Sequence, residues 1–106
     1  MAPSLLDLDH LSQQTLGNRD LQRQILELFL GHSRQQVELL KESTGRREQR
    51  EAAHAIVGSA RAIGAFDVAR IAAEIERGEG SAEAELVALA KAVEETRDFI
   101  VALLAK

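Results

Sequence analysis

The chain has 106 residues, of which 45% are hydrophobic and 28% are charged. This balance is typical of one globular domain and argues against a disordered tail or a multidomain enzyme. The chain has no cysteine, which excludes a disulfide scaffold, thiol catalysis and cysteine zinc sites and favours a reducing compartment such as the cytoplasm. A net charge of −4, a pI of about 5.4 and the absence of Tyr and Trp argue against nucleic-acid binding, because the chain lacks both basic and stacking surface.

The sequence indicates neither a signal peptide nor a membrane span. Residues 1–16 include Asp7, Asp9 and His10 and hold no unbroken apolar stretch, and no later run is long enough to cross a bilayer. The seven glycines are scattered singly and form no phosphate-binding loop, so we expect no ATP site. We therefore expect a single domain over residues 1–106, cytoplasmic, without enzymatic use of ATP.

The first predicted helix is short and spans residues 5–16. Gly17 ends it, because glycine favours the left-handed conformation that terminates helices. Its inward face is formed by four leucines, namely Leu5, Leu8, Leu11 and Leu16.

Four longer predicted helices follow, each with one apolar stripe at helical spacing. Asn18 is the expected N-cap of the first of them, and Ser81 or Ala82 begins the last. The predicted ranges are residues 19–43, 46–63, 66–77 and 82–105. Because the loops between them are short, neighbouring helices should pack antiparallel. The predicted fold is all-α, an antiparallel up-down four-helix bundle with a short N-terminal capping helix.

His54, on the second of these long helices, is the leading candidate for chemistry. It lies about 200° from Ile56 of the buried stripe and should therefore point outward. Gly58, one turn later, costs about 1 kcal/mol of helix stability, and its evident advantage is that no side chain stands beside the imidazole. The other neighbours of His54 at helical spacing are Arg47, Arg50, Glu51, Val57 and Arg61. The pattern predicts a basic, open face around a nucleophilic imidazole.

The stretch HAIVGSA from His54 to Ala60, followed by Ile63-Gly64-Ala65, resembles the signature of histidine-containing phosphotransfer (HPt) domains. Residues 29–30 (FL) and 73–76 (AEIE) fall in the order and spacing of that family, so the resemblance covers nearly the whole chain. It implies a four-helix bundle that relays phosphoryl groups between aspartates of receiver domains, with His54 as the phosphoacceptor.

One position departs from the family, which usually carries lysine three residues after the histidine, where this chain has Val57. Arg50 and Arg61 lie on the histidine face and are our candidates for placing positive charge near the phosphoryl oxygens.

Glu76 is expected beside His54. The turn after the histidine helix centres near Ala65, eleven residues beyond His54, so the antiparallel helix returns to the same height near Glu76. The family often places a glutamine or similar acceptor here, so the resemblance implies that Glu76 holds one imidazole nitrogen and leaves Nε2 free.

Receiver docking involves a further set of candidates. Gly58, Val57 and Arg47 are assigned to the docking face, as is Leu11, which we expect to be partly exposed in the capping helix. Four arginines, Arg46, Arg47, Arg50 and Arg61, against Glu48 and Glu51 leave a local charge of +2, which predicts a basic patch facing an acidic receiver.

No metal site or bound cofactor is expected on the chain. His10, His32 and His54 lie on three different predicted helices without the spacing of ligands, and Mg²⁺ is expected only on the partner receiver.

The leading hypothesis is therefore a monomeric phosphocarrier that serves response-regulator receivers and a hybrid histidine kinase. One alternative is a module of the same fold that docks on a receiver or kinase without being phosphorylated, which loss of the usual lysine at Val57 would allow. A second is a histidine-kinase dimerisation domain, but such domains carry acidic or polar residues and a proline just after the histidine, unlike residues 55–58 here.

Overall fold

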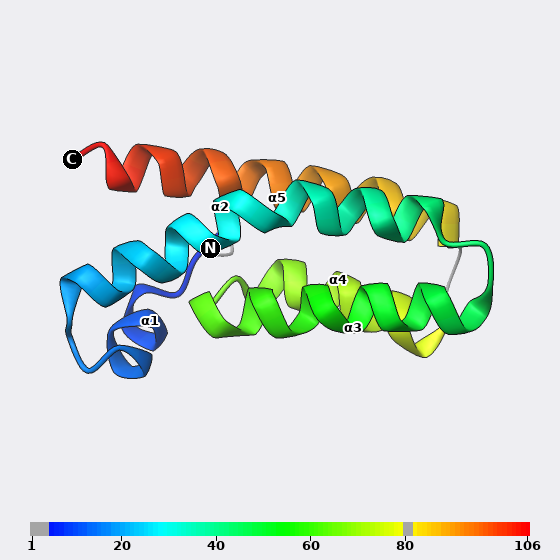
Figure 1. Ribbon diagram of the computed structural model, residues 1–106, viewed down its shortest axis with the longest axis horizontal. Coiled ribbons are helices and arrows are strands. Elements are labelled where there is room, and N and C mark those ends of the chain that lie inside the picture. The colour runs from blue at the N-terminus through cyan, green and yellow to red at the C-terminus, as the bar shows by residue number, and fades with distance from the viewer. Residues whose placement is uncertain (1–4, 80–81) are drawn as a thin grey trace.

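Five α-helices make up the described part of the chain (Figure 1). The computed structural model describes residues 5–79 and 82–106. The four long helices run antiparallel in chain order along the long axis of a body measuring 40 × 28 × 21 Å, and the short helix lies at one end. The helices are α1 (Leu8–Gln14), α2 (Arg19–Glu42), α3 (Arg46–Ile63), α4 (Phe66–Arg77) and α5 (Ala82–Leu104). The predicted all-α bundle with a capping helix is confirmed.

The ends of α2, α3 and α4 follow the predicted stop and start residues. The Asn18 side chain accepts the Leu21 backbone N–H at 3.0 Å and caps α2, as expected of asparagine at this position. Gly64 and Gly78 take left-handed conformations and end α3 and α4. Both of these helices have the predicted bounds. The last helix, α5, ends at Leu104, and the prediction for Ser81 falls outside the described residues.

The first helix is shorter than predicted, and its inward face is different. The Asp7 side chain accepts the His10 backbone N–H at 2.9 Å, which starts α1 at Leu8. Leu8 and Leu16 are 47% and 94% exposed, so their predicted inward orientation is wrong. Leu6, which precedes the helix, is buried instead. Seven helical residues present too narrow a stripe to bury four leucines, because side chains repeat on one face only every three or four residues.

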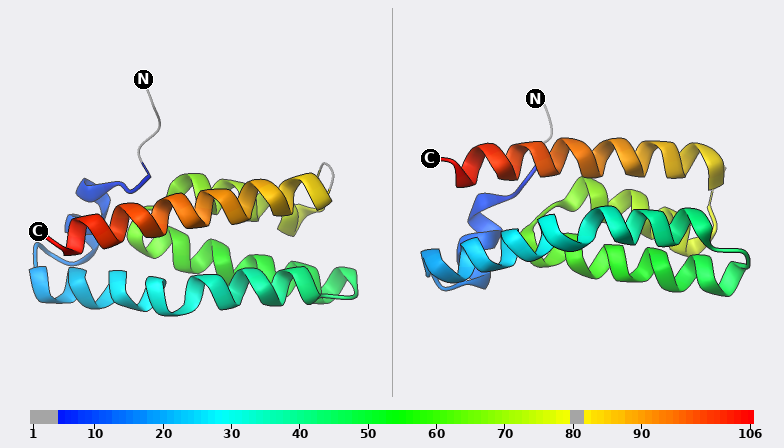
Figure 2. Two further views of the ribbon diagram at one scale, coloured as in Figure 1. Left: turned by 90° about the horizontal axis from the view of Figure 1, so that it is seen from above. Right: turned by 45° about the horizontal axis from the view of Figure 1, so that its top comes forward.

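The closest packing in the bundle is between α3 and α4. These helices share the most extensive contact of any pair, and Figure 2 shows them side by side in both views. Many of their buried residues are alanines: Ala53 and Ala60 on α3, and Ala69, Ala72 and Ala73 on α4. Small side chains allow the two backbones to approach closely, and this fixes the height of each α4 residue against α3. No helix among residues 5–79 and 82–106 is long and apolar enough to span a bilayer.

The turn between α3 and α4 also anchors the segment before α1. Gly64 has a φ of 80°, which glycine adopts without steric cost. Its carbonyl accepts the Asp7 backbone N–H at 2.9 Å. A Cβ at Gly64 would come within 2.8 Å of the Asp7 carbonyl oxygen, so glycine is required here by both conformation and space.

Replacement of Gly64 by alanine should therefore destabilise the protein more than the same replacement at Gly17. Gly17 has a similar φ of 75° but nothing within 4 Å of the added Cβ, so it reports the conformational cost alone. We expect losses of about 1 kcal/mol for Gly17→Ala and about 2–4 kcal/mol for Gly64→Ala, measured by urea unfolding followed by circular dichroism. Equal losses would contradict the close approach of Asp7.

Candidate functional site

His54 lies on the exposed side of α3, at the middle of the helix, and its side chain is 74% exposed. The preceding residue, Ala53, and the residue two later, Ile56, are fully buried or nearly so. The imidazole is thus carried by a backbone that is fixed against the core while the ring itself faces solvent.

Glu76 on α4 is the contact partner of His54. Nδ1 of the imidazole and Oε2 of Glu76 are 2.7 Å apart, which confirms the predicted proximity of the two residues. An ionised carboxylate can only accept hydrogen bonds, so Nδ1 must carry the hydrogen. In the neutral imidazole the lone pair then lies on Nε2. The Glu76 side chain is 28% exposed, so the contact lies at the partly exposed boundary between α3 and α4.

Gly58 leaves open space one turn after His54. It is exposed, and a Cβ built there would meet no atom within 4 Å. Among the described residues, then, no neighbouring atom excludes a side chain at this position. Its cost to the helix is not offset by packing within the chain.

Val57 is buried, which is a correction to its predicted place on the docking face. It is only 4% exposed. At 100° per residue Val57 stands about 60° from His54, on the side toward Ala53 and Ala60, which are both buried. This rotation is sufficient to bring it into the hydrophobic core, so it offers almost no surface to a partner.

The predicted basic patch divides into three kinds of arginine. Arg50 and Arg61 are exposed, and the structure gives their guanidinium groups no partner among the described residues. Arg47 pairs with Glu51 at 3.1 Å on the surface. Arg46 points to the end of α4, where it donates to backbone carbonyls. Arg50 and Arg61 are therefore the cations left available beside His54, one turn before it and two turns after it.

Leu11 is likewise corrected, because it is 3% exposed and belongs to the core. In α1 the exposed apolar residues are instead Leu8 and, just beyond the helix, Leu16. Leu11 points inward because the one face of α1 that packs against the bundle is the face that carries it.

The other two histidines lie apart from this site. His10 on α1 has Nε2 3.0 Å from the Arg61 carbonyl and packs edge-on against Phe66, with ring centroids 5.0 Å apart. His32 is exposed on α2. The described residues include no group of three His, Cys, Asp or Glu side chains that could hold a metal ion.

The acidic residues of α4 divide between its two sides. Glu76 faces α3, whereas Glu74 pairs with Arg70 at 3.3 Å, and its carboxyl beside Glu85 of α5 raises the pKa of Glu85 above its usual value. Glu76 is the carboxylate that the structure places on His54.

The family comparison agrees with this geometry. The family model of the Hpt domain matches residues 24–103, which is well over half of the chain. Searches of curated proteins and of solved structures found no match. The chain belongs to the Hpt domain family, whose members are phosphocarrier modules of two-component systems that interact with receiver domains and kinases.

Proposed function

We propose that this chain is a histidine phosphotransfer protein that carries a phosphoryl group between receiver aspartates on His54. One observation supports this most directly, namely an exposed imidazole whose Nδ1 is held 2.7 Å from a carboxylate. A ring held in this way presents the Nε2 lone pair outward, toward any protein that docks on α3.

The transfer step follows from that orientation. Nε2 attacks the phosphorus of the receiver's aspartyl phosphate, the P–O bond to the aspartate breaks, and the aspartate leaves as a carboxylate. The imidazole becomes a phosphoimidazolium that keeps its hydrogen on Nδ1, where the Glu76 carboxylate compensates the new positive charge. Attack by a second receiver's aspartate reverses the step and restores the neutral ring. The receiver supplies the Mg²⁺ that neutralises the phosphoryl oxygens, and we propose no cofactor on this chain.

Two further proposals concern the setting. The bundle buries its core without a partner chain, which supports a monomer. The absence of cysteine fits a cytoplasmic relay.

The chain should become labelled when it is mixed with a receiver that has been charged with radioactive acetyl phosphate. The label should be acid-labile and base-stable, as a phosphoramidate is, and His54→Gln should abolish it. His32→Gln serves as a control, because His32 is also exposed but lies on α2.

If the chain binds the charged receiver and takes no label, the protein is a docking module without phosphotransfer. Label that persists in His54→Gln would place the phosphoacceptor at another residue. Either result contradicts the proposal.

Removal of Arg50 or Arg61 should slow phosphate uptake. Both guanidinium groups flank His54 without another partner among the described residues and can donate charge-assisted hydrogen bonds to the phosphoryl oxygens. We expect each alanine variant to be about 3- to 10-fold slower, which corresponds to about 1 kcal/mol of transition-state stabilisation, in rapid-quench measurements. Arg19→Ala on α2 removes the same charge at the first residue of that helix and should leave the rate unchanged. Unchanged rates in the Arg50→Ala and Arg61→Ala variants would discard this role.

The space over Gly58 can be tested against a matched glycine in α2. Gly58 and Gly31 are both exposed, both interior to a helix, and both free of atoms within 4 Å of an added Cβ. Alanine at either position should therefore raise the unfolding free energy by about 0.5–1 kcal/mol. Gly58→Ala should nevertheless lower the phosphotransfer rate, whereas Gly31→Ala should not. A Gly58→Ala variant that transfers at the normal rate would show that the docking protein does not need this space.

A further inference from the structure

Arg46 occupies the first position of α3, where its charge is unfavourable to the helix. The N-terminus of a helix carries a partial positive charge, so a cation there is destabilising. The N-cap of α3 is Gly45, so no N-cap side chain accepts a hydrogen bond from the first turn of the helix. Within α3 the guanidinium makes one exposed hydrogen bond, from Nη1 to Oε1 of Gln49 at 3.1 Å, and this neutral partner does not compensate its charge.

The guanidinium of Arg46 also binds the C-terminal turn of α4. Nη1 donates to the Ile75 carbonyl at 3.1 Å, and Nη2 donates to the Glu76 carbonyl. Carbonyls in the last turn lie at the negative end of the helix, so a cation is favourable there, even though the Ile75 carbonyl also accepts the Gly78 backbone N–H at 3.0 Å. The fit is close, because a Cβ at Gly78 would lie 3.0 Å from Nη2.

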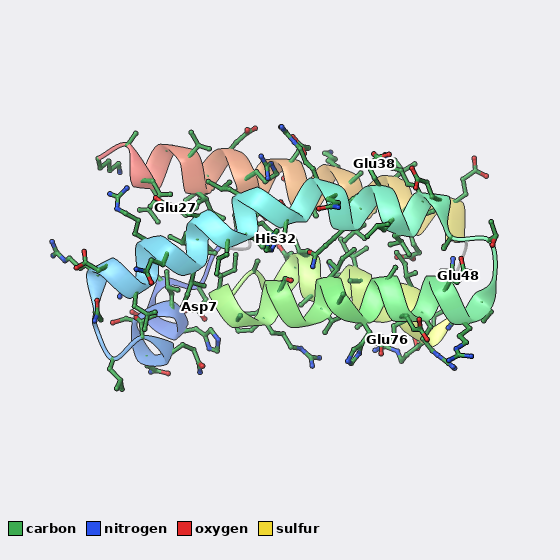
Figure 3. The ribbon with its side chains drawn as sticks, in the orientation of Figure 1. Asp7, Glu27, His32, Glu38, Glu48 and Glu76 are labelled. Carbon is green, nitrogen blue, oxygen red and sulfur yellow. The ribbon has the colours of Figure 1, made fainter. Side chains whose placement is uncertain are left out.

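The same glutamate is thus held at two points. Its backbone carbonyl accepts from Arg46, and its carboxylate contacts Nδ1 of His54. Figure 3 shows Glu76 at the edge of the bundle below the N-terminal half of α3, the half that begins with Arg46. The last turn of a helix is where fraying begins, and Glu76 is the next-to-last residue of α4. Without the hydrogen bonds from Arg46, each opening of that turn would also move the Glu76 carboxylate relative to His54.

We propose that Arg46 is a positioning residue of the phosphoacceptor site, which fixes the end of α4 so that Glu76 keeps the hydrogen of His54 on Nδ1. The proposal rests on the proposed phosphotransfer function for its purpose. The contact it describes can be measured in the unphosphorylated chain.

The experiment is to measure the tautomer of His54 by ¹⁵N NMR of the imidazole, at a pH where the ring is neutral. In the unaltered chain the hydrogen should be on Nδ1. Glu76→Ala removes the acceptor and gives the reference spectrum for a released ring. Arg46→Ala should shift the ratio of Nδ1–H to Nε2–H toward that reference by about fivefold, the size expected from loss of a hydrogen bond. Phosphate uptake should fall by a similar factor.

Arg47→Ala is the matched control, because it removes the same charge at the adjacent residue, which pairs with Glu51 at 3.1 Å. It should leave the tautomer ratio unchanged. Arg46→Lys keeps the charge but offers a single ammonium group in place of the guanidinium fork, and should restore part of the ratio. It also decides the question if Arg46→Ala fails to fold.

A tautomer ratio in Arg46→Ala, or in Arg46→Lys if only that variant folds, equal to that of Arg47→Ala would overturn the proposal. Failure of the phosphotransfer function would be recognised separately, as an unaltered chain that takes no label while its tautomer still responds to Arg46.

Discussion

The register of the α3–α4 hairpin is the constraint on which the site depends. His54 and Glu76 are 22 residues apart and meet only because Gly64 closes the turn between them in a left-handed conformation and buried alanines hold the two helices close. A shift of α4 by one residue would rotate its side chains by about 100° and carry the carboxylate away from Nδ1. The hydrogen bond that orients the imidazole is therefore a consequence of core packing, although both partners lie at the surface.

Two neighbouring residues of α3 differ in what they provide: one packs in the core and supports the helix, and the other leaves open space at the surface beside His54. Val57 is buried in the hydrophobic core, whereas Gly58 leaves open space at the surface. The glycine weakens α3, and no atom of the described chain requires that weakness. In the proposed mechanism the compensation comes from a second protein, because a phosphocarrier has little to supply beyond an oriented nucleophile and room for its partner.

The parts of the fold and site that the sequence predicts correctly are those in which glycines fix the ends of helices. The bounds of α3 and α4 and the contact of His54 with Glu76 follow from counting residues across the Gly64 turn. The orientation of Leu8 and the burial of Val57 do not, because a helical wheel gives angles between residues but not the width of the buried face, which depends on where the neighbouring helices lie. A count of charges likewise cannot show that Arg46 turns toward the end of another helix. The sequence signal for that orientation is the unfavourable position of Arg46 at the N-terminus of its own helix.

The positions of Arg50 and Arg61 suggest which cations would replace the lysine that the family usually carries three residues after the histidine. That position is turned into the core side of α3 and is filled by Val57, so a cation there would have to extend past apolar neighbours to reach Nε2. Arg50 and Arg61 approach along the exposed face instead, on either side of His54 in the helix direction. A phosphoryl group on Nε2 would then lie between two charges, each on a long and flexible side chain. Because those charges are exposed, their attraction for an acidic receiver would weaken as the salt concentration rises, whereas the buried support of the ring by the α3–α4 contact would not.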